Sequence, residues 1–448
     1  MGMGIKTDYL RNFIVSLFVL TSIILSYMLW TAGRNIGTEE ATTGQIARSS
    51  VAQISHEISD AFRPTGVALH GEDEENQIQY STTYPLKNLL RENYEVQNLE
   101  QIERSFIWTL EEYSKQLETG RWLELTYNEE QPIGLLEQRF VNLSSDFRNL
   151  FYNRMLINIE APNRIYFYNT HTEWAYEAST IDGDFLDLQP FLNEENLNYK
   201  NSFSLMLDGN IAYLPYEEVE IPYQRFVIDR FPDSIYIENF FPDTSQVDRR
   251  SQNGVTRYID LTKEVTINQN NNTISYFRQI SDPDGLDATS RFRRSFEQLN
   301  RFENWSDTFV LSHYDLETSF LEFHREIDGF PVFDSMGNET VSEVGVVESG
   351  VTNLRLPIRY INTPLSIQGS PTGVLISGTE LVNQLQTGLQ GRALSDIQNI
   401  CIGYTWVESD EDSQVIYFNP SWYVQINDEW QTLENFLQVS EAGDINGF

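Results

Sequence analysis

The chain has 448 residues, with 66 acidic and 30 basic side chains and a formal net charge of −36 at neutral pH. Hydrophobic residues make up 40% of the chain and aromatic residues 13%, which excludes a disordered polymer and is sufficient for about two or three domains with cores. The negative charge argues against nucleic-acid binding, and the single cysteine excludes an internal disulfide.

Residues 13–33 are predicted to form a single transmembrane helix. These 21 residues carry no charge, and at about 1.5 Å per residue they rise roughly 31 Å, the thickness of a hydrocarbon core. Basic residues precede the segment and acidic residues follow Arg34, so the positive-inside rule places residues 1–12 in the cytoplasm. The predicted localisation is the cell membrane, with the C-terminal bulk outside the cytoplasm.

A cleaved signal peptide is the alternative interpretation of this segment, because the small residues at 31–33 suit a signal peptidase. The apolar run is longer than the ~7–15 residues of a signal peptide. Tyr27 and Trp30 also lie where interfacial aromatic residues anchor a permanent helix. We therefore expect a permanent anchor.

The predicted helix contains a candidate contact for a partner helix. Ser22 and Ser26 are small residues four positions apart, and Thr21 lies beside them. Such a pair lets a second helix approach closely, and the hydroxyls can bond across the contact. The alternative is that these hydroxyls bond back to their own helix.

Residues 34–180 are predicted to form an N-terminal α+β domain outside the membrane. Apolar spacing indicates a connector helix at about 35–60, a helix that opens at Pro85, and a helix from about 103 to 117 that stops at Gly120. Alternation and β-branched or aromatic residues indicate short strands between these helices. The predicted strands are 67–69, 78–80, 122–127, 165–168 and 173–179.

Residues 181–288 are predicted to form a middle, β-rich domain. Asp208-Gly209 between residues 202–207 and 211–214 is a strong hairpin signal. Residues 265–268 and 273–277 flank a polar turn and indicate a second hairpin. Long alternation of strands and helices is missing from the pattern, which argues against a nucleotide-binding parallel sheet.

Residues 289–448 are predicted to form a C-terminal α+β domain. An amphipathic helix near 290–302 opens it, and Thr379 caps a second helix. We expect antiparallel sheets with helices packed on one face. The predicted strands are 320–323, 331–333, 344–347, 354–360, 397–406, 415–418 and 422–426.

The first helix of this domain carries a local cluster of positive charge. Arg291, Arg293, Arg294 and Arg301 lie on or beside it in a chain that is otherwise acidic. Such a cluster can dock an acidic partner surface, with electrostatics setting specificity and encounter rate. The alternative is a solvated helix face that pairs with Glu297 and its neighbours.

The sequence favours a protein that is not an enzyme and that uses no cofactor or metal. None of the five histidines lies in an HExxH pattern, and no GxSxG motif is present. Cys401 lies in an apolar strand pattern that is typical of a buried, inert thiol. Hydrolysis of a wall polymer remains the enzyme alternative, because carboxylates are too numerous to single out a catalytic pair.

The order of several motifs resembles the YycH family of Gram-positive bacteria. The resemblance covers nearly the whole chain and implies a membrane-anchored accessory protein of the WalK/WalR two-component system of the cell wall. It further implies a three-domain α+β exterior that acts with a similar protein, YycI, on the sensor histidine kinase WalK. The motifs are the N-terminal anchor, Phe62-Arg63-Pro64-Thr65, Gly329-Phe330-Pro331-Val332-Phe333, Gly403-Tyr404 and Asn419-Pro420-Ser421-Trp422-Tyr423.

We therefore expect a single-pass, non-catalytic regulator whose exterior senses or transmits binding. Besides a wall-polymer hydrolase, a solute-binding module remains an alternative. A lipoprotein of that kind would need a cysteine near the anchor, and the only cysteine is Cys401.

Overall fold

The structure, a computed structural model, describes residues 56–71, 78–82, 97–98, 104–141, 143–180, 186–192, 197–241, 243–280, 285–302, 308–315, 318–367, 369, 371–388 and 393–438. These residues belong to one compact unit, Ala52–Phe448. The predicted transmembrane helix at 13–33, with Thr21, Ser22 and Ser26, lies outside the described residues.

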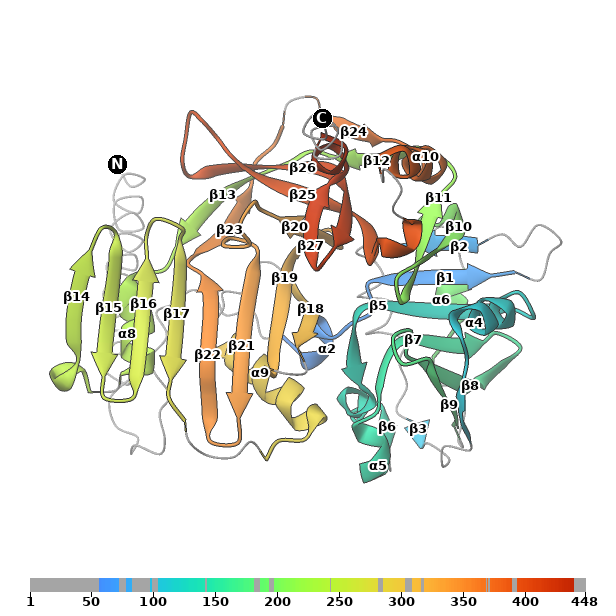
Figure 1. Ribbon diagram of the computed structural model, residues 1–448, viewed down its shortest axis with the longest axis horizontal. Helices are drawn as coiled ribbons and strands as arrows, with labels where there is room; N and C mark the ends of the chain where they lie inside the picture. Colours follow the sequence, from blue (N-terminus) through green and yellow to red (C-terminus); the bar gives the residue numbers. More distant parts are fainter. Residues whose placement is uncertain are drawn as a thin grey trace, which may run out of the picture. The chain divides into compact units, whose positions relative to one another are not determined.

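Nine antiparallel strands form the first large sheet, in the order β11-β10-β2-β1-β5-β7-β8-β9-β4 (Figure 1). Strands from the middle of the chain extend it, because β10 pairs with β2 across more than 100 residues of sequence. The strands are β1 (Gly66–His70), β2 (Ile78–Ser81), β4 (Arg104–Ile107), β5 (Trp122–Pro132), β7 (Phe151–Asn158), β8 (Ala161–Tyr168), β9 (Trp174–Ser179), β10 (Lys200–Leu207) and β11 (Asn210–Pro215).

Fourteen strands form the second large sheet, whose main path runs β14-β15-β16-β17-β22-β21-β19-β20-β25-β26-β13-β23. β18 joins it beside β19 and β27 beside β26, and the β20–β25 pair is parallel. The strands are β13 (Gln224–Arg230), β14 (Asp248–Gln252), β15 (Val255–Asp260), β16 (Lys263–Asn268), β17 (Thr273–Arg278), β18 (Thr308–Asp315), β19 (Phe320–Ile327), β20 (Phe330–Phe333), β21 (Val341–Val347), β22 (Gly350–Pro357), β23 (Arg359–Pro364), β25 (Asn399–Glu408), β26 (Val415–Ile426) and β27 (Glu429–Thr432).

Two small sheets and a few helices complete the fold. β3 (Gln97–Asn98) pairs with β6 (Phe140–Val141), and β12 (Val219–Pro222) pairs with β24 (Thr372–Leu375). The helices are α2 (Ile58–Ala61), α4 (Leu110–Leu117), α5 (Ser145–Arg148), α6 (Gln189–Leu192), α8 (Asp233–Phe240), α9 (Ala288–Phe302) and α10 (Gly378–Gly388), with 3₁₀ turns η1 (Ile133–Leu136), η2 (Thr244–Gln246) and η3 (Leu394–Asp396).

The mixed α+β class predicted from the sequence is confirmed, and strands greatly outnumber helices among the described elements. Asp208-Gly209 does turn a hairpin, in which Leu207 pairs with Asn210. The predicted hairpin at 265–277 is β16–β17. The division into domains at 34–180, 181–288 and 289–448 stays a prediction.

Four element predictions were wrong in detail. Thr379 lies inside α10, and Ser377 Oγ accepts from the Glu380 backbone N–H at the start of that helix. The predicted strand 354–360 is divided between β22 and β23.

Residues 104–107 are not the first turn of a helix but strand β4, which pairs with β9. The helix begins at Leu110 because Thr109 and Glu112 form a capping box that satisfies each other's backbone N–H groups. The predicted strands 415–418 and 422–426 are one strand, β26, in which Pro420 lies opposite Tyr404.

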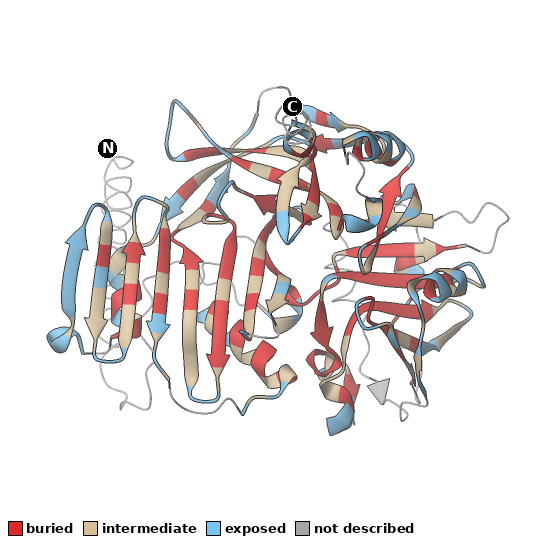
Figure 2. Cartoon of the chain, in the orientation of Figure 1, coloured by how far each residue is buried: buried red, intermediate tan, exposed pale blue. Residues whose placement is uncertain are grey.

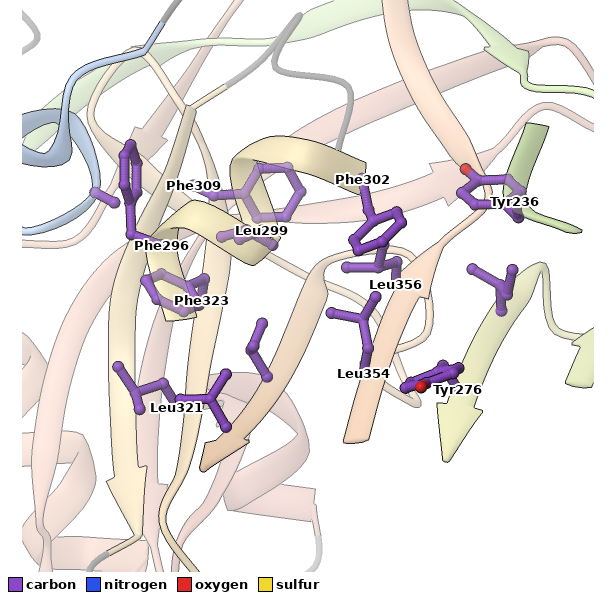
Figure 3. Close-up of a cluster of buried hydrophobic side chains, with 14 of the residues drawn as sticks. Tyr236, Tyr276, Phe296, Leu299, Phe302, Phe309, Leu321, Phe323, Leu354 and Leu356 are labelled. Atoms are coloured by element: carbon purple, nitrogen blue, oxygen red, sulfur yellow. The ribbon is translucent and has the colours of Figure 1, made fainter. Parts of the chain in front are cut away.

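The core of the second sheet forms where α9 packs against β21 and its neighbours. The apolar residues of α9 recur every three or four positions, so Phe296, Leu299 and Phe302 lie on one helix face (Figure 3). Leu354 and Leu356 alternate toward this face from β22. Each of these buried side chains contributes about 1.5–3 kcal/mol of hydrophobic free energy.

The first sheet carries a core on each of its faces. Leu123 and Leu125 of β5 belong to one cluster, whereas Trp122 belongs to another that includes Tyr113 of α4 and Tyr168 of β8. Strand β5 is therefore buried on both faces over its first six residues. Figure 2 shows this contrast with β14, whose five residues are all exposed.

Candidate functional site

The two large sheets and the segments that flank them contact each other in several places, of which two are described first. In the first, Phe62 packs its ring against Phe292 of α9 and Phe323 of β19, at centroid distances of 5.7 Å each. In the second, the β10–β11 hairpin enters the C-terminal core, and the Asp208 amide donates to the Ile397 carbonyl at 2.9 Å. The sheets are thus joined at separated points.

A cavity of about 1210 Å³ is lined by residues of both sheets. Strands β5, β10 and β11 of the first sheet supply one wall. Strands β18, β20, β25 and β27 and the turn between β19 and β20 supply the other. The cavity is larger than the ~300–1000 Å³ of a typical small-molecule site, so we treat it as the candidate functional site.

Three motifs that are distant in the sequence meet at this cavity, and Gly403-Tyr404 pairs with one of them. Thr65, Phe330, Phe333 and Trp422 all line it. The parallel β20–β25 pair places Val332 opposite Tyr404, and the Phe333 ring stacks on Tyr423 with centroids 4.1 Å apart. The motifs therefore build one structural unit.

Gly403 is required at the centre of this unit by close packing. A Cβ atom at this position would lie 2.7 Å from the Phe333 ring and 2.8 Å from the Pro331 carbonyl oxygen. A backbone atom at that distance moves only if the strand moves. Gly403 thus allows β20 and β25 to approach each other.

A buried ion pair joins the Phe62–Thr65 segment to the second sheet. The Arg63 guanidinium donates to the Glu326 carboxylate of β19, and both side chains are almost fully buried. Gln131 of β5 donates to the Phe62 carbonyl at 3.2 Å. Removing one partner of such a pair costs about 3–5 kcal/mol, so this contact fixes the segment firmly.

A second ion pair crosses between the sheets at the cavity wall. His313 Nδ1 of β18 lies 3.4 Å from Glu129 Oε2 of β5. The bond to Glu129 raises the pKa of His313, although burial opposes this, and Glu322 and Asp428 add to the increase. The pair therefore becomes stronger when His313 is protonated.

A related pair lies on the same wall within the first sheet. His171 Nδ1 is 3.8 Å from Glu130 Oε2, and Asn169 donates to the same oxygen at 2.6 Å. The Glu130 contact raises the pKa of His171. Burial opposes ionisation of Glu130, but its bonds from His171 and Asn169 hold its pKa below the usual value.

Glu124 forms a buried charged centre behind the first wall. Its side chain is 0% exposed and lies on β5. Although burial opposes ionisation, the bond from His70 and the charge of Arg154 hold the pKa of Glu124 below its usual value. The four groups around the carboxylate are His70 Nε2 at 2.8 Å, Tyr113 OH at 2.8 Å, Tyr213 OH at 2.5 Å and Arg154 Nε at 3.3 Å.

Arg154 extends this centre to the cavity. Its Nη2 donates to Asn210 Oδ1 at 2.6 Å and to the Ile211 carbonyl at 3.1 Å, which attaches β11 to β7. Burial raises the pKa values of Tyr113 and Tyr213 well above the usual range, so both remain neutral donors. The centre therefore holds five elements together as a structural network.

Most arginines of the predicted cluster on α9 bind groups within the protein. Arg291 is buried and donates to the Val346 carbonyl at 2.9 Å. Arg294 is half-buried and donates to the carbonyls of Val347 and Glu348. Arg301 is exposed, with its guanidinium 5.2 Å from the centroid of the neighbouring Phe302 ring. A partner contact at these residues stays a prediction.

Cys401 lies on β25 and lines the cavity, where burial strongly raises the pKa of its thiol. This favours the inert thiol that the sequence predicts. Across the described ranges, no group of three or more His, Cys, Asp or Glu side chains has a geometry that could hold a metal ion. Among the helices in the described part of the chain, none is both long and apolar enough to cross a membrane.

Sequence reasoning missed the cavity and the Glu124 centre. The cavity lining comes from many short segments of the chain, so no local pattern marks it. Glu124 lies between Leu123 and Leu125 in the sequence. This alternation predicts that Glu124 is the exposed residue of a half-buried strand. The burial of both faces of β5 depends on the sheet as a whole.

Comparison with known proteins identifies relatives over most of the chain. Residues 8–193 match the family model described as "YycH protein, N-terminal domain", and residues 210–441 match "YycH protein, C-terminal domain". The crystal structure of YycH from Bacillus subtilis is similar with a TM-score of 0.67 and 14% identity, covering 85% of this chain and 98% of that one.

A second similar structure is an uncharacterized protein from Eubacterium rectale, with a TM-score of 0.32 and 11% identity. That match covers 55% of this chain and 92% of the other, and its score is too low to support an argument. No curated protein matches the chain.

Proposed function

The chain belongs to the YycH family, and on that premise we propose that it is a membrane-anchored, extracytoplasmic regulator of a WalK-type sensor histidine kinase. The family is a regulatory one associated with the WalK/WalR system. The observation that carries the proposal is that the two family matches together run from residue 8 to residue 441.

The proposed membrane anchor rests on the sequence of residues 13–33. This uncharged segment falls inside the N-terminal family match, and Lys6 and Arg11 precede it. By the positive-inside rule the N-terminus is cytoplasmic and the folded unit is extracytoplasmic. A kinase that spans the same membrane is then within reach of both the helix and the exterior.

The proposal includes lateral contact with the kinase and with a YycI-like accessory protein. Within the membrane, Thr21, Ser22 and Ser26 offer the close approach that small residues allow. Outside it, the exposed Arg301 is the proposed contact for an acidic partner surface.

The described geometry supports regulation more than catalysis. The buried carboxylates of Glu124 and Glu326 each bond to an arginine or tyrosine of another element. Such pairing stabilises a fold, whereas a general acid or base needs a proton poised near neutral pH at an open site. Hydrolysis of a wall polymer is the less supported alternative.

Co-purification tests the proposed partners. A C-terminally tagged full chain is extracted in mild detergent and the recovered membrane proteins are identified by mass spectrometry. Ser22→Leu/Ser26→Leu should reduce recovery of the kinase about threefold to tenfold, because bulk at these positions blocks helix approach.

Ser16→Leu is the matched control, because it lies roughly 100° away around the predicted helix. It should leave recovery unchanged. Equal recovery with all three chains would remove the helix contact from the proposal, and absence of any histidine kinase from the wild-type sample would contradict the proposed function.

The topology is tested separately in protoplasts. Protease added outside should digest the folded unit and spare a small N-terminal tag. Survival of the C-terminal tag would contradict the proposed orientation.

A further inference from the structure

The cavity between the two sheets has the size and construction of a binding site for an extended ligand. Its volume of about 1210 Å³ is larger than a drug-sized molecule requires. Neither sheet forms it alone, because β11 supplies one wall and β20 and β25 supply the other. The contacts at Phe62 and at Asp208 join the two walls.

The charge on the described lining is strongly negative. Glu129, Glu130 and Glu326 are paired with His313, His171 and Arg63. A further set of carboxylates belongs to exposed residues of the cavity lining. They are Asp208, Glu218, Glu220, Asp328 and Asp428.

Positive charge on the same lining is scarce. The Arg154 guanidinium is already engaged by Glu124, Asn210 and three backbone carbonyls. Lys200 is the remaining ammonium group among the described lining residues. The electrostatic potential inside the cavity therefore favours a ligand with positive charge.

Asp328 is one of the carboxylates that give the cavity its negative charge. It occupies the turn between β19 and β20, and it accepts a hydrogen bond from Gln224 at 2.5 Å. In the described part of the chain it forms no ion pair, and desolvation raises its pKa. A cation that approached this carboxylate would supply an opposite charge next to it.

Two aromatic residues of the lining are close to these carboxylates in the sequence. Phe330 opens β20 two residues after Asp328, and Trp430 lies on β27 two residues after Asp428. Both rings are half-buried, so part of each faces the cavity. Aromatic faces together with carboxylates are the usual protein partners of ammonium groups.

The lining also offers amides, which suit a peptide backbone. Gln398, Asn399 and Gln425 line the wall formed by β25, β26 and the residues before them. The Gln398 amide is already engaged by Asp428, because its Nε2 donates to Asp428 Oδ1 at 2.7 Å and its Oε1 accepts from the Asp428 backbone N–H at 2.7 Å. Asn399 Oδ1 accepts from the Ile400 backbone N–H. Gln425 and the Asn399 NH2 group can bond to a peptide backbone. We propose that the cavity between the two sheets binds an extended cationic peptide that carries several amino groups. Binding of such a peptide does not require the proposed contact with a kinase.

Binding of a pentalysine peptide with blocked ends tests the inference on the full chain in mild detergent. Calorimetry gives the affinity, and the fluorescence of Trp422 and Trp430 in the cavity gives a second measure. Pentalysine should bind, and the same peptide with acetylated side chains should bind at least tenfold more weakly. Equal binding of the two peptides, or none of pentalysine, would overturn the inference.

Paired variants separate the cavity from the general acidity of the chain. Asp328→Asn/Asp428→Asn should weaken pentalysine binding about tenfold, because two charges next to the ligand are removed. Glu238→Gln on α8 combined with Glu297→Gln on α9 changes the net charge equally outside the cavity lining and should leave the affinity within about twofold.

Equal weakening by both double variants would show attraction by the overall charge and contradict a specific site. A neutral oligosaccharide that bound tightly while pentalysine did not would contradict the ligand class. Phe330→Leu removes an aromatic face without altering charge and should weaken binding about threefold. It serves as the second variant if the aspartate variant does not fold.

Discussion

Each of the two large sheets buries a charged side chain completely, but the two sheets compensate that charge in different ways. Glu124 of β5 and Arg325 of β19 are both 0% exposed. The carboxylate is surrounded by hydrogen-bond donors from other elements, namely His70, Tyr113, Tyr213 and Arg154.

The guanidinium of Arg325 lies against two ring faces, and its charge also acts on Glu339. Its Cζ lies 5.3 Å from the ring centroids of both Phe309 and Trp406, and Nη2 donates to the Arg359 carbonyl at 3.1 Å. A guanidinium is planar and weakly hydrated, so aromatic faces can replace much of its water. A carboxylate needs donors, and its burial therefore requires more elements to be in place at once.

Replacing Glu124 is expected to have the largest effect. Glu124→Leu leaves Arg154 buried without its carboxylate, and the free energy of unfolding should fall by about 3–5 kcal/mol. Urea denaturation followed by tryptophan fluorescence measures this. The matched control Glu118→Leu at the exposed end of α4 should change stability by less than about 0.5 kcal/mol. A loss below about 1 kcal/mol would show that the donors find other partners.

Gly403→Ala tests how far the second sheet depends on the fit of β25, which also carries Trp406. The new Cβ would meet the Pro331 carbonyl and the Phe333 ring, and such overpacking costs about 1–3 kcal/mol. Gly285→Ala is the control, because the nearest atom to its Cβ is the end of the Glu348 side chain. Equal melting temperatures of the two variants would contradict the close approach of β20 and β25.

Arg325→Met should be milder than Glu124→Leu, because a long apolar side chain keeps the contacts with Phe309 and Trp406. We expect a loss of about 1–2 kcal/mol, measured by the same urea denaturation. A loss as large as that of Glu124→Leu would break the comparison and assign Arg325 the same role as the carboxylate centre.

The half-exposed pair of His313 and Glu129 joins the two sheets and should contribute least. Because the folded pKa of His313 is raised, its stabilisation is complete below the unfolded pKa of about 6.5 and is lost as pH rises through the folded value. His313→Gln should therefore reduce stability by less than about 1 kcal/mol at pH 5.5 and have no effect at pH 9. A larger effect at pH 9 would reverse the sign and contradict the ion pair.

Local features of the fold were predictable from the sequence. Asp208-Gly209 marks its hairpin because few residues adopt such a turn, and the three- to four-residue spacing of Phe292, Phe296 and Leu299 marks α9. The motif order also identified the family. These signals depend on neighbours in the chain.

The long-range features were not predictable in the same way. The β2–β10 pair joins residues 78–80 to 200–202, and the β20–β25 pair joins 332–333 to 404–405. The sequence of neither strand in such a pair indicates which strand it pairs with. The cavity depends on these pairings. Asp328 and Asp428 therefore line the same cavity only after both sheets have formed.

The pairing of β2 with β10 has a consequence for how the chain is made. Strand β2 is synthesised more than 100 residues before Lys200. The edge of β2 that pairs with β10 therefore stays unpaired while the intervening chain is synthesised. Unpaired edges of this kind attract other strands. Long-range β pairing is also slow to form. During that interval the nascent chain is at its most vulnerable to aggregation, and a fragment that ends before Lys200 would retain this exposed edge permanently.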